Sequence, residues 1–67
     1  MDVIVNGEPQ DLPTKLTIAE LLEHLALAEP RGVAVAVNDA VVPRGRHAHA
    51  VLASGDRVEI VRAVQGG

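Results

Sequence analysis

The strongest constraint in this sequence is that only one segment has a helical pattern, and β-favouring segments lie on both sides of it. Thr17-Ile18-Ala19-Glu20 has the order of a capping box, in which the Thr17 hydroxyl accepts from the Glu20 backbone N–H and the Glu20 side chain reaches back. Apolar side chains then recur along one helix face at Ile18, Leu21, Leu22 and Leu25. The pattern predicts one amphipathic helix from about Ile18 to about Ala28, ending before the next proline.

The N-terminal part of the chain is typical of a β-hairpin. Val3 to Val5 form a short β-favouring run, and Asn6-Gly7 is the strongest two-residue hairpin signal. The return arm runs from Glu8 to Leu12, and Pro9 favours an edge strand there because proline has no N–H to donate to a neighbouring strand.

Further strands follow the helix. Val33 to Val37 alternates Val with Ala, which predicts valines on one face, and Asn38-Asp39 turns the chain into a return strand at Ala40 to Val42. The last strand is predicted at Arg57 to Val64, with Val58 and Ile60 on one face and Glu59 and Val61 on the other. The order of elements predicts an α+β fold, with one helix packed on one face of a small sheet.

The composition limits what such a fold can do. The chain has 67 residues, no cysteine and no aromatic residue, so we expect a single domain whose core is built from Val, Leu, Ile and Ala. The absence of cysteine excludes a disulfide framework and a thiol nucleophile, and the absence of aromatic rings excludes an aromatic-lined pocket. We expect a domain of this kind to act through a surface or a tail.

Charge and hydropathy exclude two further classes of function. The formal net charge is −3, and an acidic chain without aromatic rings is poorly suited to binding nucleic acid. The mildly acidic surface would suit a partner with a basic face, or would simply keep the domain soluble. No apolar run approaches the length of a membrane span and nothing resembles a secretory signal, so the cytoplasm is the expected location.

Candidates for conventional catalysis are weak. Ser54, His49 and Asp56 could be drawn as a triad, but nothing marks a nucleophile elbow, and Ser54 lies in an expected turn. His47 and His49 could face the same way, but a zinc site needs a third ligand, and we interpret both as surface histidines of a loop. We therefore predict no catalytic residue, no metal site and no enzymatic activity of the chain's own.

The remaining candidate for chemistry is the Gln65-Gly66-Gly67 ending. Two glycines make a thin, permissive segment that can enter a narrow channel of another protein, and a terminal carboxylate is the group it would deliver. A carboxylate must first be activated, for example by adenylation with ATP and magnesium held by a partner enzyme. A sulfur nucleophile could then displace AMP and leave a thiocarboxylate. An inert tail on an interaction domain is the alternative.

Motifs along the whole chain resemble those of the ThiS family of sulfur carriers. They include Asn6-Gly7, Thr17-Ile18-Ala19-Glu20-Leu21-Leu22, Val35-Ala36-Val37-Asn38, Val42-Pro43-Arg44, Gly55-Asp56-Arg57-Val58-Glu59-Ile60 and Ala63-Val64-Gln65-Gly66-Gly67. The resemblance implies a β-grasp, ubiquitin-like fold: a small mixed sheet crossed by one main helix. We accordingly expect a domain over residues 1–64 and a flexible C-terminal tail over residues 65–67. Family members often carry an aromatic residue shortly after the Val-Pro-Arg motif, where this chain has His47 and Ala48.

The resemblance also implies a reaction and its partners. Gly67 would be adenylated by a ThiF-type adenylyltransferase, converted to a thiocarboxylate with sulfur from a donor such as a persulfide-bearing protein, and consumed by thiazole synthase in thiamine biosynthesis. Val64, Gln65 and Gly66 would enter the partner's active site. Carriers for molybdopterin or tRNA thiolation share these features and remain alternatives, although molybdopterin carriers usually have prolines before the two glycines. We expect ATP and magnesium to be consumed by the partner, with no cofactor bound to the chain.

A docking surface follows from the predicted last strand. If Val58 and Ile60 face the helix, then Val61 and Ala63 lie on the open face of the sheet immediately before the tail. An exposed apolar patch at this position would suit recognition by a partner protein.

Overall fold

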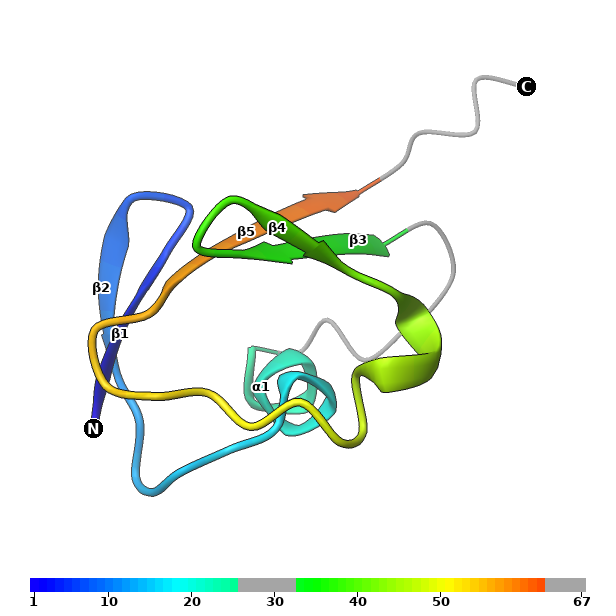
Figure 1. Cartoon of the computed structure of the whole chain (residues 1–67). Coiled ribbons are helices and arrows are strands. Elements are labelled where there is room, and N and C mark those ends of the chain that lie inside the picture. The colour runs from blue at the N-terminus through cyan, green and yellow to red at the C-terminus, as the bar shows by residue number, and fades with distance from the viewer. Residues whose placement is uncertain (26–32, 63–67) are drawn as a thin grey trace.

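The computed structural model describes residues 1–25 and 33–62 of the chain, which form five strands, one α-helix and one turn of 3₁₀ helix (Figure 1). The strands are β1 (Asp2–Val5), β2 (Glu8–Asp11), β3 (Val33–Val37), β4 (Ala40–Val42) and β5 (Arg57–Arg62). The helix α1 spans Ile18–His24, and the 3₁₀ turn η1 spans Arg44–Arg46. The predicted order of elements is confirmed.

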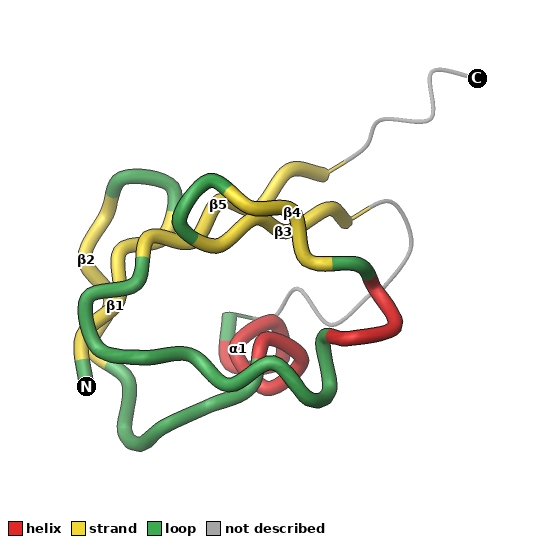
Figure 2. The backbone as a smooth tube through the Cα atoms, viewed as in Figure 1, coloured by secondary structure: helices red, strands yellow, loops and turns green. Residues whose placement is uncertain are grey.

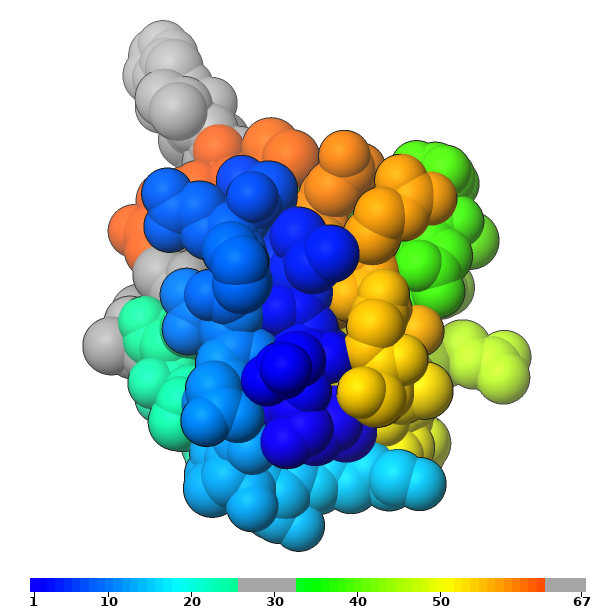
Figure 3. All heavy atoms as spheres, turned by 90° about the vertical axis from the view of Figure 1, so that its left-hand side faces the viewer, coloured from blue at the N-terminus to red at the C-terminus, as the bar shows by residue number. Residues whose placement is uncertain are grey.

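All five strands belong to one mixed sheet with the order β2-β1-β5-β3-β4. The last strand in the sequence therefore lies at the centre, parallel to β1 and antiparallel to β3 (Figure 2). A mixed sheet with a central C-terminal strand and one helix across it is the predicted β-grasp architecture. Figure 3 shows β1 between β2 and the segment that leads into β5, and β2 is the edge strand expected from Pro9.

The core lies between the sheet and α1, which crosses below it in Figure 1. The sheet contributes one face of its strands, and α1 contributes the apolar stripe seen in the sequence. Two leucines from the connecting segments complete the core. Its buried members are Val3, Val5, Leu12, Ile18, Leu21, Leu22, Val35, Leu52 and Val58. Within residues 1–25 and 33–62, no helix is long and apolar enough to cross a membrane.

Two tight turns are as the sequence predicts. Asn6 and Gly7 have φ values of 50° and 84°, and Asn38 and Asp39 have φ values of 51° and 72°. Left-handed conformations at both central residues fit the right-handed twist of the strands on either side. Asparagine, aspartate and glycine tolerate this region better than other residues, so the turns are set by the local sequence.

Every N–H at the beginning of α1 has a partner. The Thr17 hydroxyl accepts from the Glu20 N–H at 3.1 Å, and the Glu20 carboxylate accepts from the Thr17 N–H at 2.8 Å, so the predicted capping box is confirmed. The N–H groups of Ile18 and Ala19 donate to the carbonyls of Ala50 and His47, both at 3.0 Å. Through these bonds, residues 47–50 of the long connection before β5 hold the first turn of α1.

Two predicted boundaries differ from the structure. We expected the helix to continue to about Ala28, but α1 ends at His24, because Leu25 has a ψ of 7° and caps the helix. Residues 26–28 lie outside the described residues. The predicted return arm included Leu12, which follows β2 as a buried core residue. The predicted end of the last strand, Val64, is not among these differences. The structure describes β5 as far as Arg62, and residues 63 and 64 lie outside the described residues.

The prediction that His47 is a surface residue is wrong. Only 8% of its surface is exposed, and its Nε2 lies 3.0 Å from the Val42 carbonyl oxygen. A carbonyl can only accept, so Nε2 carries the proton in this contact. The residue lies directly after η1, which turns it inward, whereas His49 is exposed as predicted.

Candidate functional site

The predicted site begins where the central strand leaves the sheet. β5 ends at Arg62, and Ala63, Val64, Gln65, Gly66 and Gly67 lie outside the described residues. The assignment of these five residues to docking and chemistry therefore stays a prediction. The described residues do show how the strand that leads to them is held.

The beginning of β5 is fixed by two polar side chains. The Asn38 carboxamide accepts from the Arg57 N–H at 3.0 Å and donates to the Asp56 carboxylate at 3.1 Å. The second Asp56 oxygen accepts from the Ala53 N–H at 2.8 Å. One carboxylate oxygen of Asp56 thus holds the turn at residues 53–56 and the other holds Asn38. These bonds account for Asp56 without the triad that could be drawn with Ser54 and His49.

The end of β5 is held on one side by Asn6. Its Oδ1 accepts from the Ile60 N–H at 2.8 Å, and its Nδ2 donates to the Ile60 carbonyl at 3.2 Å. On the other side, β3 pairs with β5 as far as Arg62, which lies opposite Val33. The sequence around Asn6 indicates only a turn residue, and no local pattern signals its contact with a strand more than fifty positions later.

An apolar patch lies on the face of the sheet away from α1. Val61 is 61% exposed, which confirms its predicted exposure, and it lies opposite the exposed Ala34 of β3. Val41, which is 77% exposed, lies opposite the half-buried Ala36 on the other side of β3. We call these four residues, Ala34, Ala36, Val41 and Val61, the open-face patch. It begins one residue before the end of β5, beside the exit toward the tail.

Charged side chains border this patch along β5. Glu59 lies opposite Ala36 and is exposed. Arg57 donates to the Asp39 carboxylate at 3.0 Å, and both side chains are mostly exposed. An exposed pair of this kind adds little stability. The border therefore offers polar groups of both signs around an apolar centre, the arrangement found in many protein–protein interfaces.

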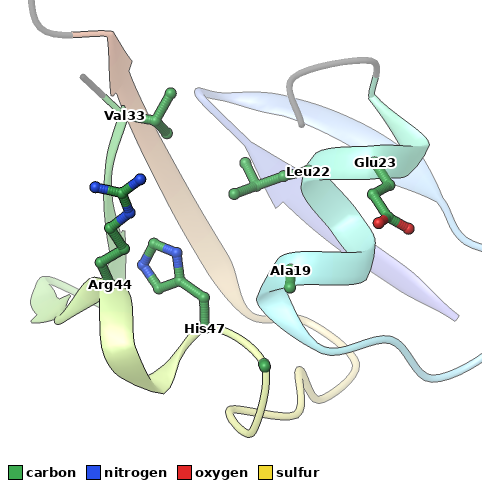
Figure 4. A pocket seen from close by; sticks show the side chains of 7 residues that line it. Ala19, Leu22, Glu23, Val33, Arg44 and His47 are labelled. Carbon is green, nitrogen blue, oxygen red and sulfur yellow. The ribbon is translucent and has the colours of Figure 1, made fainter. Parts of the chain in front are cut away.

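The helix side carries a separate cavity of about 270 Å³, between α1 and residues 44–48 (Figure 4). Ala19 and Leu22 of α1 line one side, and Arg44 and His47 line the other. Among residues 1–25 and 33–62, no group of three or more His, Cys, Asp or Glu side chains could hold a metal ion. No Ser, Thr, Cys or Lys is among the described residues that line the cavity, and the cavity lies on the opposite face of the sheet from the open-face patch.

Comparison with known proteins gives one consistent result. The family model described as "ThiS family" matches residues 3–67. The sulfur carrier protein ThiS of Escherichia coli is 30% identical over 67 residues, which is the whole of both chains. The crystal structure of the thiamine biosynthesis protein ThiS from Geobacter metallireducens superposes with a TM-score of 0.86, at 32% identity over the full length of both chains.

A second kind of relative is much longer. The thiazole synthase of Magnetococcus marinus is 40% identical over 67 residues, but this chain spans only about a fifth, 20%, of that protein's length. The chain therefore resembles one part of a larger protein as well as small proteins of its own size.

Proposed function

The chain belongs to the ThiS family, and on that premise we propose that it is a sulfur carrier of thiamine biosynthesis that works through the carboxylate of Gly67. The observation that carries the proposal is the match over residues 3–67, which extends through the Gly66-Gly67 ending. The fold adds support, since the central strand of the sheet leads directly toward this ending.

The proposed reaction has two steps. A Gly67 carboxylate oxygen attacks the α-phosphorus of ATP in a ThiF-type enzyme, which releases pyrophosphate and leaves an acyl adenylate. Hydrosulfide then attacks the acyl carbon and displaces AMP, which gives the thiocarboxylate. A persulfide-bearing donor would give an acyl disulfide instead, and a thiol would have to reduce it. The enzyme supplies magnesium and the groups that stabilise the phosphates.

In this proposal the chain contributes reach and recognition rather than acid–base catalysis. Five residues follow Arg62, and an extended chain covers about 3.3 Å per residue, so Gly67 can lie about 16 Å beyond the sheet. That distance lets the reacting carbon enter an active site while the folded domain stays outside. Glycine at the last two positions keeps the entering segment thin.

We propose that the open-face patch is where the adenylating enzyme docks. Apolar side chains that are exposed together are typical of interaction sites, and Val61 lies six residues before Gly67. Docking at this position would hold the domain close to the channel that receives the tail. Ala63 belongs to the same predicted surface.

Thiazole synthase is the proposed acceptor of the sulfur. Two proteins named thiazole synthase, from Magnetococcus marinus and Paramagnetospirillum magneticum, contain a part similar to the whole of this chain. A carrier region within the synthase itself supports direct transfer between the two activities. We propose the cytoplasm, where ATP is available, as the place of the reaction.

Adenylation tests the proposal before any sulfur is added. The chain is incubated with a ThiF-type enzyme, ATP, magnesium and labelled pyrophosphate, and exchange of label into ATP is measured. We expect exchange with the intact chain and none after deletion of Gly67, because deletion moves the carboxylate one residue back. Equal exchange by both chains would refute the role of Gly67.

The choice of acceptor is tested separately. Chain carrying the thiocarboxylate is mixed with thiazole synthase and its other substrates, or with a molybdopterin synthase or a tRNA thiolase. We expect the chain to lose its sulfur in the mixture with thiazole synthase and to keep it in the other two mixtures. Faster loss with either other enzyme would place the chain in that pathway.

A further inference from the structure

The last part of β5 has a neighbouring strand on one side only. All five residues of β3 pair with β5, from Val37 opposite Val58 to Val33 opposite Arg62. The pairing with β1 ends where Val5 lies opposite Val58, because β1 then turns away into the hairpin (Figure 2). After Val58, the side of β5 that faces β1 has no further strand to pair with among the described residues.

The carboxamide of Asn6 takes the place of the missing strand. The backbone N–H of Asn6 donates to the Val58 carbonyl at 2.9 Å, and its side chain then pairs with both backbone polar groups of Ile60. Alternate residues of a strand direct these groups to the same side, so Val58 and Ile60 are consecutive partners on this side. The Asn6 side chain thus continues the hydrogen bonding between β1 and β5 as far as Ile60, beyond the last paired residue of β1.

We propose that Asn6 is a positioning residue for the carrier tail. By pairing with Ile60 it fixes the direction in which β5 leaves the sheet, and so determines where the partner enzyme receives Gly67. Seven positions separate Ile60 from Gly67, or about 23 Å of extended chain. The direction of the strand at Ile60 therefore sets the region that the reacting carbon can reach. This inference rests on the proposed function.

Asn38 provides a matched control. It has nearly the same left-handed φ, it also begins a two-residue turn, and its carboxamide also makes two hydrogen bonds at β5. Those bonds involve Arg57 and Asp56, at the opposite end of the strand. Glycine tolerates the left-handed region, so Asn6→Gly and Asn38→Gly each remove two side-chain hydrogen bonds while the turn is kept. The two variants differ in which end of β5 is released.

Steady-state loading kinetics separate positioning from general destabilisation. With a ThiF-type enzyme, ATP and sulfide, we expect Asn6→Gly to raise the KM for the carrier about tenfold with kcat within about twofold, because the strand end must be ordered on binding. Asn38→Gly should leave the KM within about twofold of the original chain. Asn6→Asp keeps the acceptor for the Ile60 N–H but faces its carbonyl with a carboxylate, and should fall between. Equal KM changes in the two glycine variants would overturn the proposal.

A second measurement keeps the inference apart from the proposed function. If the unaltered chain is not loaded at all, the carrier function fails, and ¹⁵N relaxation then decides whether Asn6 orders the strand. Order parameters of the Val61 and Arg62 amides should fall in Asn6→Gly and not in Asn38→Gly. Unchanged order parameters in Asn6→Gly would overturn the positioning role whatever the result of the loading assay.

Discussion

His47 connects three parts of the molecule through one residue. Its ring is buried and its Nε2 donates to the carbonyl of Val42 at the end of β4, while its own carbonyl accepts from the Ala19 N–H in the first turn of α1. In a chain without Phe, Tyr or Trp, this imidazole is a planar ring available to fill space beside α1.

Replacement of His47 should therefore cost stability. His47→Ala removes a partly buried hydrogen bond and leaves a void, and we expect the free energy of unfolding to fall by about 2 kcal/mol. His49→Ala is the control, because His49 is exposed and should change stability by less than about 0.5 kcal/mol. Urea unfolding of the three chains measures both values, and equal losses in the two variants would contradict the structural role of His47.

At the scale of elements, α1 is short and depends on its caps. A helix of seven residues is unstable alone in water, so it needs the packing of its apolar face and satisfied N–H groups at its first turn. The capping box satisfies the Glu20 N–H, and the carbonyls of His47 and Ala50 satisfy those of Ala19 and Ile18. The segment before β5 therefore stabilises α1, and α1 in turn covers the core.

Removal of the capping hydroxyl tests this dependence. Thr17→Ala should lower the free energy of unfolding by about 1 kcal/mol, and Thr17→Ser should retain most of it, because serine also caps helices well. Thr14→Ala, at an exposed position before the helix, should change stability by less than about 0.5 kcal/mol. Thermal and urea unfolding provide the values; a loss in Thr14→Ala as large as in Thr17→Ala would argue against the capping role.

What the sequence predicted at this scale was set by local interactions. The Asn6-Gly7 and Asn38-Asp39 turns, the capping box and the alternation of β3 each depend on residues within about four positions of one another. The burial of His47 depends on η1 and the end of β4, and the Asn6–Ile60 contact depends on the return of β5 to β1. Neither leaves a local pattern, because a polar residue in a turn looks the same whether or not its side chain bonds a distant strand. The end of α1 at His24 was also missed, since the following residues are good helix formers.

At the scale of the whole molecule, the two faces of the sheet have different surroundings. One face is covered by α1 and the long connection before β5, while the other leaves the open-face patch exposed beside the exit toward the tail. A folded domain with an exposed apolar patch, together with the proposed reactive ending, would suit a protein that passes from one enzyme to another. Only the first two of these lie within the described residues, and Val61 is the residue of the docking prediction that they confirm as exposed.

The docking role can be tested with two valines of nearly equal exposure. Val61 is 61% exposed on the open face, and Val51 is 59% exposed in the connection beside α1, where it pairs with Thr17. We expect Val61→Asp to raise the KM of the adenylating enzyme for the carrier about tenfold, since a carboxylate would be buried at an apolar contact. Val51→Asp should leave the KM within about twofold.

Folding must be checked in both variants. Each valine is exposed, so neither aspartate should lower the free energy of unfolding by more than about 1 kcal/mol. Normal loading by folded Val61→Asp, or equal loss in both variants, would move the docking site away from the open-face patch.

The most direct test of the carrier function is the intact mass of the chain after incubation with a ThiF-type enzyme, ATP, magnesium and sulfide. We predict a gain equal to the exchange of one oxygen for sulfur, which appears only with ATP and disappears when Gly67 is deleted. An unchanged mass under conditions that load another member of the ThiS family would contradict the proposal that Gly67 of this chain carries sulfur.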